Sequence, residues 1–253
     1  MLFLLLLALF AAMLALAVLG HRLGRRRLLG ETDQERVGIV SVETAIFGLM
    51  GLIFAFTYAG AAQRFEQRRV LTIQEANAIG TVYLRIDLVA EGARPALRGK
   101  VKRYAQSLHS AYDSLPDEKA FDRGLAQARA LQGEIWNDAV AALRDAPPVA
   151  NQLLIPALND MFDLNVTHEA VVRVKTPGAI LATLVILAFI CSLLAGYGLA
   201  GSRPWAHFLH KVGFALVVTG IVYIVIDYDY PRFGLIRIDF ADRALETTIA
   251  GMK

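Results

Sequence analysis

The first residue in this sequence whose type and position suggest chemistry is Glu43, an acid inside the long apolar stretch 37–62. An ionisable side chain at that depth is costly in a membrane, so it would pair with a cation or hold a proton. Alternatively, the apolar helix begins near Ala45, which would leave Glu43 at the interface between lipid and water. The sequence leaves both interpretations open.

A second group of acids closes the last apolar stretch, where Asp227 and Asp229 stand just before Arg232. Acids are unfavourable at a helix C-terminus because the helix dipole is negative there. We therefore expect a salt bridge from these acids to Arg232, or to an arginine at the foot of the second apolar stretch, such as Arg64 or Arg68. The alternative is that the two carboxylates bind a cation.

The third group, Glu75 and Asn77, stands two residues apart in a segment of helical pattern. Side chains two apart on a helix do not face each other, so one ligand would not engage both. We expect each to make a polar contact between packed helices or subunits.

No catalytic or metal-binding pattern is found. The sequence lacks G-x-S-x-G, P-loop, H-E-x-x-H and Gly-rich dinucleotide motifs. His207 and His210 have no carboxylate or cysteine close in sequence, and Cys191 is the only cysteine. We therefore predict a protein that is not an enzyme and that uses no cofactor and no metal.

Four apolar stretches must position these residues. Each reaches or approaches the roughly 20 residues that a helix needs to cross the hydrocarbon core. The first stretch has no charge before residue 21 and is long for a signal peptide, which favours a retained anchor. The stretches cover about 2–20, 37–62, 178–200 and 205–226.

The composition agrees with a membrane protein whose partner is the lipid bilayer. Hydrophobic residues make up 56% of the chain and charged residues only 19%. The net charge of +3 comes from short basic runs beside the apolar stretches, so nucleic acid is not an expected partner.

The polar insert between spans two and three has helical periodicity throughout. Nothing breaks a helix firmly between Ala62 and Gly92, so span two should continue into the insert as one long helix that Gly92 and Pro95 end. Three further helices follow, and the last tolerates Pro156 only near its first turn. The predicted fold is thus all-α, with four spans and a helical-bundle insert.

This pattern divides the chain into four parts. The predicted parts are a first membrane hairpin (1–62), an extramembrane helical domain (63–177), a second membrane hairpin (178–226) and a C-terminal tail (227–253).

Three segments carry a resemblance to a known family: 64–69 (RFEQRR), 75–85 (EANAIGTVYLR) and 227–234 (DYDYPRFG). With two spans, a helical insert and two more spans, the chain resembles the bestrophin-like family of four-span bacterial membrane proteins, remotely similar to bestrophin anion channels. The motif residues are Arg64, Glu75, Asn77, Asp227, Asp229, Pro231 and Arg232.

The resemblance implies a homo-oligomer, a pentamer on the bestrophin pattern, that passes small anions along a pore lined by span two. At four-residue spacing span two carries the stripe Ile46, Met50, Phe54 and Tyr58, which could form a narrow apolar neck. The alternatives are that this stripe faces lipid or a neighbouring helix, and that the protein is a membrane-anchored scaffold or sensor without transport activity.

Two signals disagree about orientation in the plasma (inner) membrane. Arginines follow the first span, and the positive-inside rule would keep that loop in the cytoplasm and place the insert and both termini outside. The resemblance implies the reverse, because true bestrophins keep the insert and termini in the cytoplasm.

Overall fold

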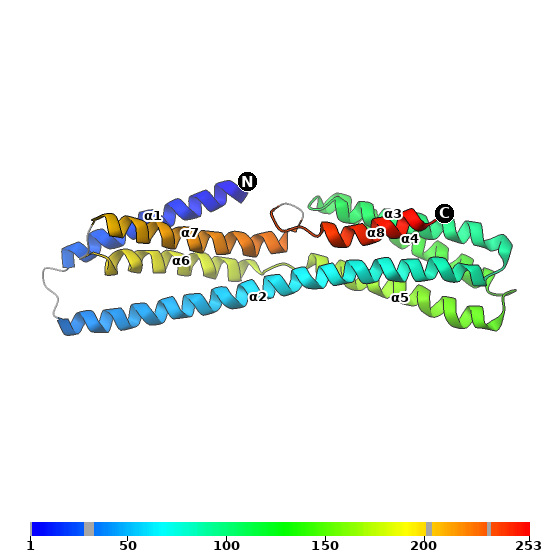
Figure 1. Cartoon of the computed structure of the whole chain (residues 1–253), viewed down its shortest axis with the longest axis horizontal. Helices are drawn as coiled ribbons and strands as arrows, with labels where there is room; N and C mark the ends of the chain where they lie inside the picture. Colours follow the sequence, from blue (N-terminus) through cyan, green and yellow to red (C-terminus); the bar gives the residue numbers. More distant parts are fainter. Residues whose placement is uncertain (1, 28–32, 201–203, 232–233) are drawn as a thin grey trace. The chain divides into compact units, whose positions relative to one another are not determined.

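The computed structural model describes residues 2–27, 33–200, 204–231 and 234–253, and all the regular structure in these ranges is helical (Figure 1). The prediction of an all-α chain is confirmed. The α-helices are α1 (Leu2–Arg27), α2 (Asp33–Arg85), α3 (Arg94–Asp113), α4 (Glu118–Ala142), α5 (Pro148–Arg173), α6 (Gly178–Gly198), α7 (Pro204–Asp229) and α8 (Asp239–Gly251).

The chain forms two compact units. Unit 1 comprises Met1–Gln63 and Lys175–Asp229, and unit 2 comprises Arg64–Val174 and Tyr230–Lys253. α2 contributes to both units, and the C-terminal segment adds α8 to unit 2.

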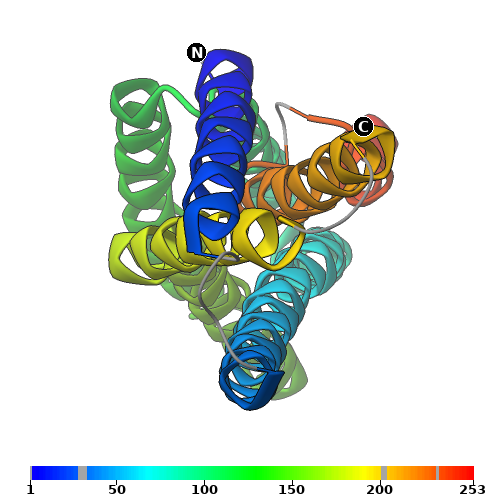
Figure 2. The ribbon, with the colours of Figure 1, turned by 90° about the vertical axis from the view of Figure 1, so that its left-hand side faces the viewer.

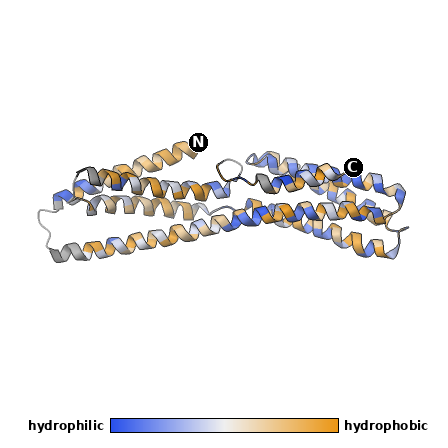
Figure 3. Ribbon diagram, in the orientation of Figure 1, coloured by the Kyte–Doolittle hydropathy of each residue, from blue (hydrophilic) through white to orange (hydrophobic). Residues whose placement is uncertain are grey.

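Four helices among the described residues are long and apolar enough to cross a membrane. They are α1, α2, α6 and α7, and apolar residues predominate along them within unit 1 (Figure 3). The four spans predicted from the sequence are confirmed.

α2 is a single helix of 53 residues, as the absence of a firm helix breaker predicted. It ends at Arg85 rather than at Gly92 or Pro95 and is followed by short 3₁₀ helices at Ile86–Leu88 and Glu91–Ala93. Ile86 and Val89, which follow this end, are buried in the core, and each is only 1% exposed.

In unit 1, α1 packs closely on α6 through small residues (Figure 2). A Cβ atom added at Gly20 would overlap the carbonyl oxygen of Leu193, and one added at Gly196 would overlap that of Ala17. Small residues allow this backbone approach, which is how membrane helices gain packing energy.

Unit 2 is a bundle of α3, α4, α5, α8 and the second part of α2 around an apolar core. Asp117 caps α4 by accepting a hydrogen bond from the backbone N–H of Ala120 at 3.0 Å. Leu245 and Met252, from the C-terminal segment, are buried in the same core.

The expectation for Pro156 was wrong. α5 begins at Pro148, which places Pro156 in the third turn rather than the first. The ring removes the bond to the carbonyl of Gln152, and both residues are exposed, so this carbonyl can bond to water.

Candidate functional site

A buried polar network surrounds Glu75 of α2, whose side chain is completely buried in unit 2. Its Oε2 lies 2.9 Å from Nδ1 of His168 on α5, and its Oε1 accepts a hydrogen bond from Asn165 at 2.9 Å. Glu75 points inward because it shares a helical face with Thr72 and Ile79, which are also buried.

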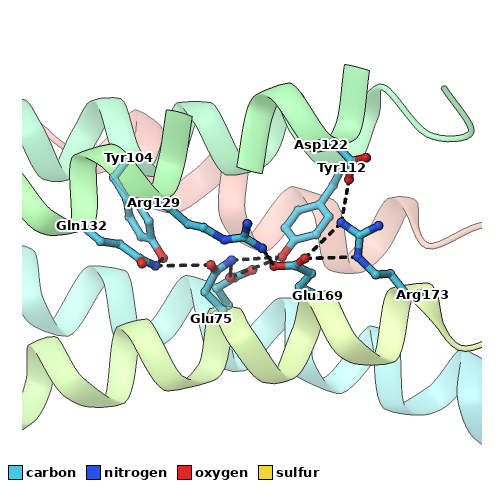
Figure 4. Close-up of polar contacts among 9 residues, drawn as sticks. Glu75, Tyr104, Tyr112, Asp122, Arg129, Gln132, Glu169 and Arg173 are labelled. Atoms are coloured by element: carbon cyan, nitrogen blue, oxygen red, sulfur yellow. Dashed lines mark hydrogen bonds and ion pairs between the residues drawn. The ribbon is translucent and has the colours of Figure 1, made fainter. Parts of the chain in front are cut away.

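Helices α3 and α4 complete this network (Figure 4). Tyr112 on α3 donates to the same carboxylate at 3.4 Å, and its ring centroid lies 4.4 Å from that of His168. Gln132 on α4 donates to Asn165 at 3.3 Å and to the hydroxyl of Tyr104 at 3.1 Å. Four helices of unit 2 therefore contribute to one network around this carboxylate.

The electrostatics keep the two phenols of this network neutral. Burial raises the pKa of Tyr104 above its ordinary value, and the nearby charge of Glu75 raises it further. Burial and the same charge also raise the pKa of Tyr112. The carboxylate is thus surrounded by neutral hydrogen-bond donors and one imidazole.

The network includes a hydroxyl, an imidazole and a carboxylate in the order found in nucleophilic enzymes. Thr72 Oγ1 lies 3.4 Å from Nε2 of His168, which contacts Glu75 through its other nitrogen. However, the Thr72 hydroxyl donates to the carbonyl of Arg68 in its own helix at 2.9 Å, and all three side chains are at most 4% exposed. A substrate would not reach this hydroxyl, so we assign the arrangement to helix packing.

Asn77 lies on the opposite side of α2 from Glu75 and is exposed. It lines a groove of about 540 Å³ between α2 and α5, together with Thr81 of α2 and the acids Asp160 and Asp163 of α5. Glu75 and Asn77 of the EANAIGT segment thus face different surroundings, as their two-residue spacing requires.

Arg68 is a charged residue buried near the C-terminal end of α5. Its guanidinium donates to the carbonyls of Val174, at 2.6 Å, and Val171, at 3.4 Å. It therefore satisfies carbonyls that have no partner inside the helix and places a positive charge at the negative end of the helix dipole.

A second polar chain lies on the surface of unit 2 (Figure 4). Glu169 pairs with Arg129 at 2.5 Å and with Arg173 at 3.0 Å, and Arg173 also reaches Asp122 at 2.6 Å. The arginines and Asp122 are largely exposed, so these pairs contribute little to stability.

The acids that close α7 are buried within unit 1. Asp229 accepts a hydrogen bond from the backbone N–H of Thr176 at 2.8 Å, and Asp227 is 2% exposed. Pro231 follows the end of α7, while Arg232 lies outside the described residues. The salt bridges expected for these acids stay predictions.

The predicted pore stripe faces the other helices of unit 1 over part of its length. Met50 and Phe54 are 9% and 4% exposed and belong to the core of unit 1, and Ile46 is half-buried. Tyr58 is exposed and its ring meets that of Tyr228 edge to face, at 5.7 Å. Their role in lining a pore stays a prediction.

Glu43 is half-buried near α6. Its Oε2 would lie 3.0 Å from a Cβ atom at Gly198, so the glycine leaves room for the carboxylate. Its Oε1 is buried with no hydrogen-bond partner among the described residues.

Arg64 is half-buried where α2 enters unit 2. Among the described residues, no three His, Cys, Asp or Glu side chains gather as a metal site.

Asn165 and His168 were not predicted from the sequence as part of this network, although a signal was present. They continue the buried stripe Leu154, Leu158 and Met161 of α5 at alternating intervals of four and three. Polar residues at core positions of an amphipathic helix usually have a buried polar partner. That spacing would have pointed to a partner for them inside the bundle.

Together these features define an all-α membrane protein with four spans and a helical bundle. The sequence model described as the bestrophin-like domain matches residues 11–240. The chain therefore belongs to the bestrophin-like family, which confirms the resemblance seen in the sequence.

Solved structures of a bacterial bestrophin homologue from Klebsiella pneumoniae share this fold. One has a TM-score of 0.70 at 16% identity, with 95% of this chain and 97% of that chain covered. A variant of that homologue has a TM-score of 0.71 at 15% identity, covering 96% and 98%. No curated protein matches the chain.

Proposed function

We propose that this chain assembles into an oligomer that conducts small anions across the inner membrane. The match to the bestrophin-like family over residues 11–240 carries this proposal, because bestrophins are channels rather than enzymes. Several copies are needed to enclose a pathway, and five is the number that the bestrophin resemblance suggests.

Burial identifies a second candidate for the pore-lining face of α2. Leu49, Leu52 and Phe56 are 52%, 52% and 69% exposed, whereas Phe54 packs within unit 1. We propose that this exposed face lines the pathway and that Phe54 holds α2 in position by packing in the core of unit 1. A ring of such apolar side chains would gate by dewetting.

Chloride flux into vesicles that contain the purified chain tests both assignments. We expect Phe56→Ala to change the rate or selectivity of flux without lowering thermal stability. The matched variant Phe54→Ala should cost about 3–5 kcal/mol of stability, because it empties a buried ring position. If Phe54→Ala changes selectivity and Phe56→Ala does not, the stripe Ile46, Met50, Phe54 and Tyr58 is the lining.

Absence of flux from a folded, oligomeric preparation would contradict the channel and favour the scaffold or sensor. The same preparation must therefore be checked for its assembled mass and thermal unfolding before the flux is interpreted. Intact empty vesicles give the baseline.

We orient unit 2 and both termini in the cytoplasm, on the bestrophin pattern and against the distribution of arginines. The test uses Cys191→Ser with Gln127→Cys, an exposed position on α4. Protection of this cysteine from an impermeant thiol reagent in intact cells supports the cytoplasmic orientation. Labelling in intact cells would reverse it.

A further inference from the structure

The exposed side chains of α2 within unit 2 follow one regular stripe. After Arg69, the exposed positions of this helix are Val70, Gln74, Asn77, Thr81 and Leu84, at successive intervals of four, three, four and three residues. Helices that pack along one another show this alternation, because it keeps a single narrow face toward the partner.

This stripe carries no charge, unlike another outer helix of the same unit. The exposed positions of α4 include charged side chains that suit contact with water. They are Glu118, Lys119, Asp122, Arg123, Arg129 and Glu134. On the α2 stripe, by contrast, Val70 and Leu84 are 40% and 70% exposed at the two ends of an uncharged row.

The chemistry of the stripe matches a second copy of itself. The amides of Gln74 and Asn77 and the hydroxyl of Thr81 both donate and accept hydrogen bonds. A copy of the stripe therefore offers a partner for each group on it, and Val70 and Leu84 gain apolar contacts. The acids that share the groove with Asn77 and Thr81, Asp160 and Asp163, belong to α5 and not to the stripe. An asparagine within such a seam also fixes the register of the paired helices.

We propose that the stripe Val70, Gln74, Asn77, Thr81 and Leu84 contacts a second copy of this chain. This inference rests on the oligomer of the proposed function and names one of its contact surfaces. It gives Glu75 and Asn77 of the EANAIGT segment separate roles: Glu75 joins the helices of one subunit, and Asn77 joins subunits.

Cysteine cross-linking in membranes tests this contact. In a Cys191→Ser background, Asn77→Cys is compared with Gln127→Cys on α4, and both samples are oxidised and run on a denaturing gel. Because a disulfide needs Cβ atoms within about 4.5 Å, we expect about tenfold more linked dimer from Asn77→Cys than from the control. Thr81→Cys provides a second position on the same stripe.

Free labelling of both stripe cysteines by a soluble maleimide, without linked dimer, would overturn the contact. The mass of the native particle in detergent separates the two proposals. An intact oligomer without the link contradicts only this surface, whereas a single-copy particle contradicts the oligomer as well.

A pair of charge-adding variants gives an independent readout. Asn77→Asp places like charges opposite each other at the proposed seam, while Asn137→Asp adds the same charge at an exposed site on α4. We expect about tenfold weaker assembly for the first and unchanged assembly for the second. Equal assembly of the two variants would contradict the seam.

Discussion

The two units of this chain hold their helices together in opposite ways. In unit 1, glycines bring the backbones of α1 and α6 into contact beside an apolar cluster, and the buried acids lie at the end of α7. In unit 2, an apolar core surrounds the buried carboxylate of Glu75, which accepts hydrogen bonds from side chains of α3 and α5.

The proposed surroundings of the two units, lipid for unit 1 and water for unit 2, account for this difference. Lipid is as apolar as a leucine side chain, so helices in a membrane gain little from burial and depend on close packing. In water, burial of apolar surface contributes about 25 cal/mol per Å², which can offset the cost of enclosing Glu75. Unit 1 should therefore be sensitive to added atoms and unit 2 to lost polar partners.

The largest effect is expected in unit 2, from His168→Leu. This change removes the imidazole 2.9 Å from the Glu75 carboxylate and leaves a buried acid without it. We expect a loss of about 3–5 kcal/mol in the free energy of unfolding. Thermal and denaturant unfolding in detergent, followed by circular dichroism, measures it.

Two further variants test whether this loss of stability comes from breaking the contact between Glu75 and His168. The double variant Glu75→Leu, His168→Leu should regain part of the stability, because no buried charge remains, although Asn165 and Tyr112 lose an acceptor. Glu66→Gln breaks the exposed pair with Arg69 and should cost less than about 1 kcal/mol. A double variant as unstable as the single one would refute the argument from uncompensated charge.

A somewhat smaller effect is expected in unit 1, from Gly196→Ala. The added methyl group would overlap the carbonyl of Ala17, so α1 and α6 must separate. We expect a cost of about 3 kcal/mol, at the upper end for overpacking. The measurement is the thermal midpoint of the purified chain in detergent.

Gly213→Ala is the matched control in α7, where an added Cβ would meet nothing within 4 Å. It should be neutral or slightly stabilising, because alanine favours a helix. Equal destabilisation by the two alanines would mean that the close approach of α1 and α6 does not hold unit 1 together.

The same contrast explains what could be predicted from the sequence. The spans and the long α2 follow from local features, namely the apolar stretches and the absence of a helix breaker. The partners of Glu75 do not, because they lie 37, 90 and 93 residues away on other helices. Similarly, the spacing of Met50 and Phe54 predicts a shared face of α2, but packing against other helices decides what that face meets.

The smallest effect concerns the phenol of Tyr104, at the edge of the polar network. Tyr104→Phe removes the hydrogen bond from Gln132 and should cost about 1 kcal/mol at about pH 8. Burial raises the pKa of Tyr104 in the folded chain. The contribution of the neutral phenol to the free energy of unfolding is therefore complete below the ordinary tyrosine pKa of about 10, and it is lost as the pH rises above that value. The unfolded chain releases the proton first, so the gap in stability between wild type and variant should be constant to about pH 9, shrink towards about pH 11 and then reverse. Unfolding of both proteins across this range measures the gap, and a constant gap would mean that the folded chain gives up this proton as readily as the unfolded one.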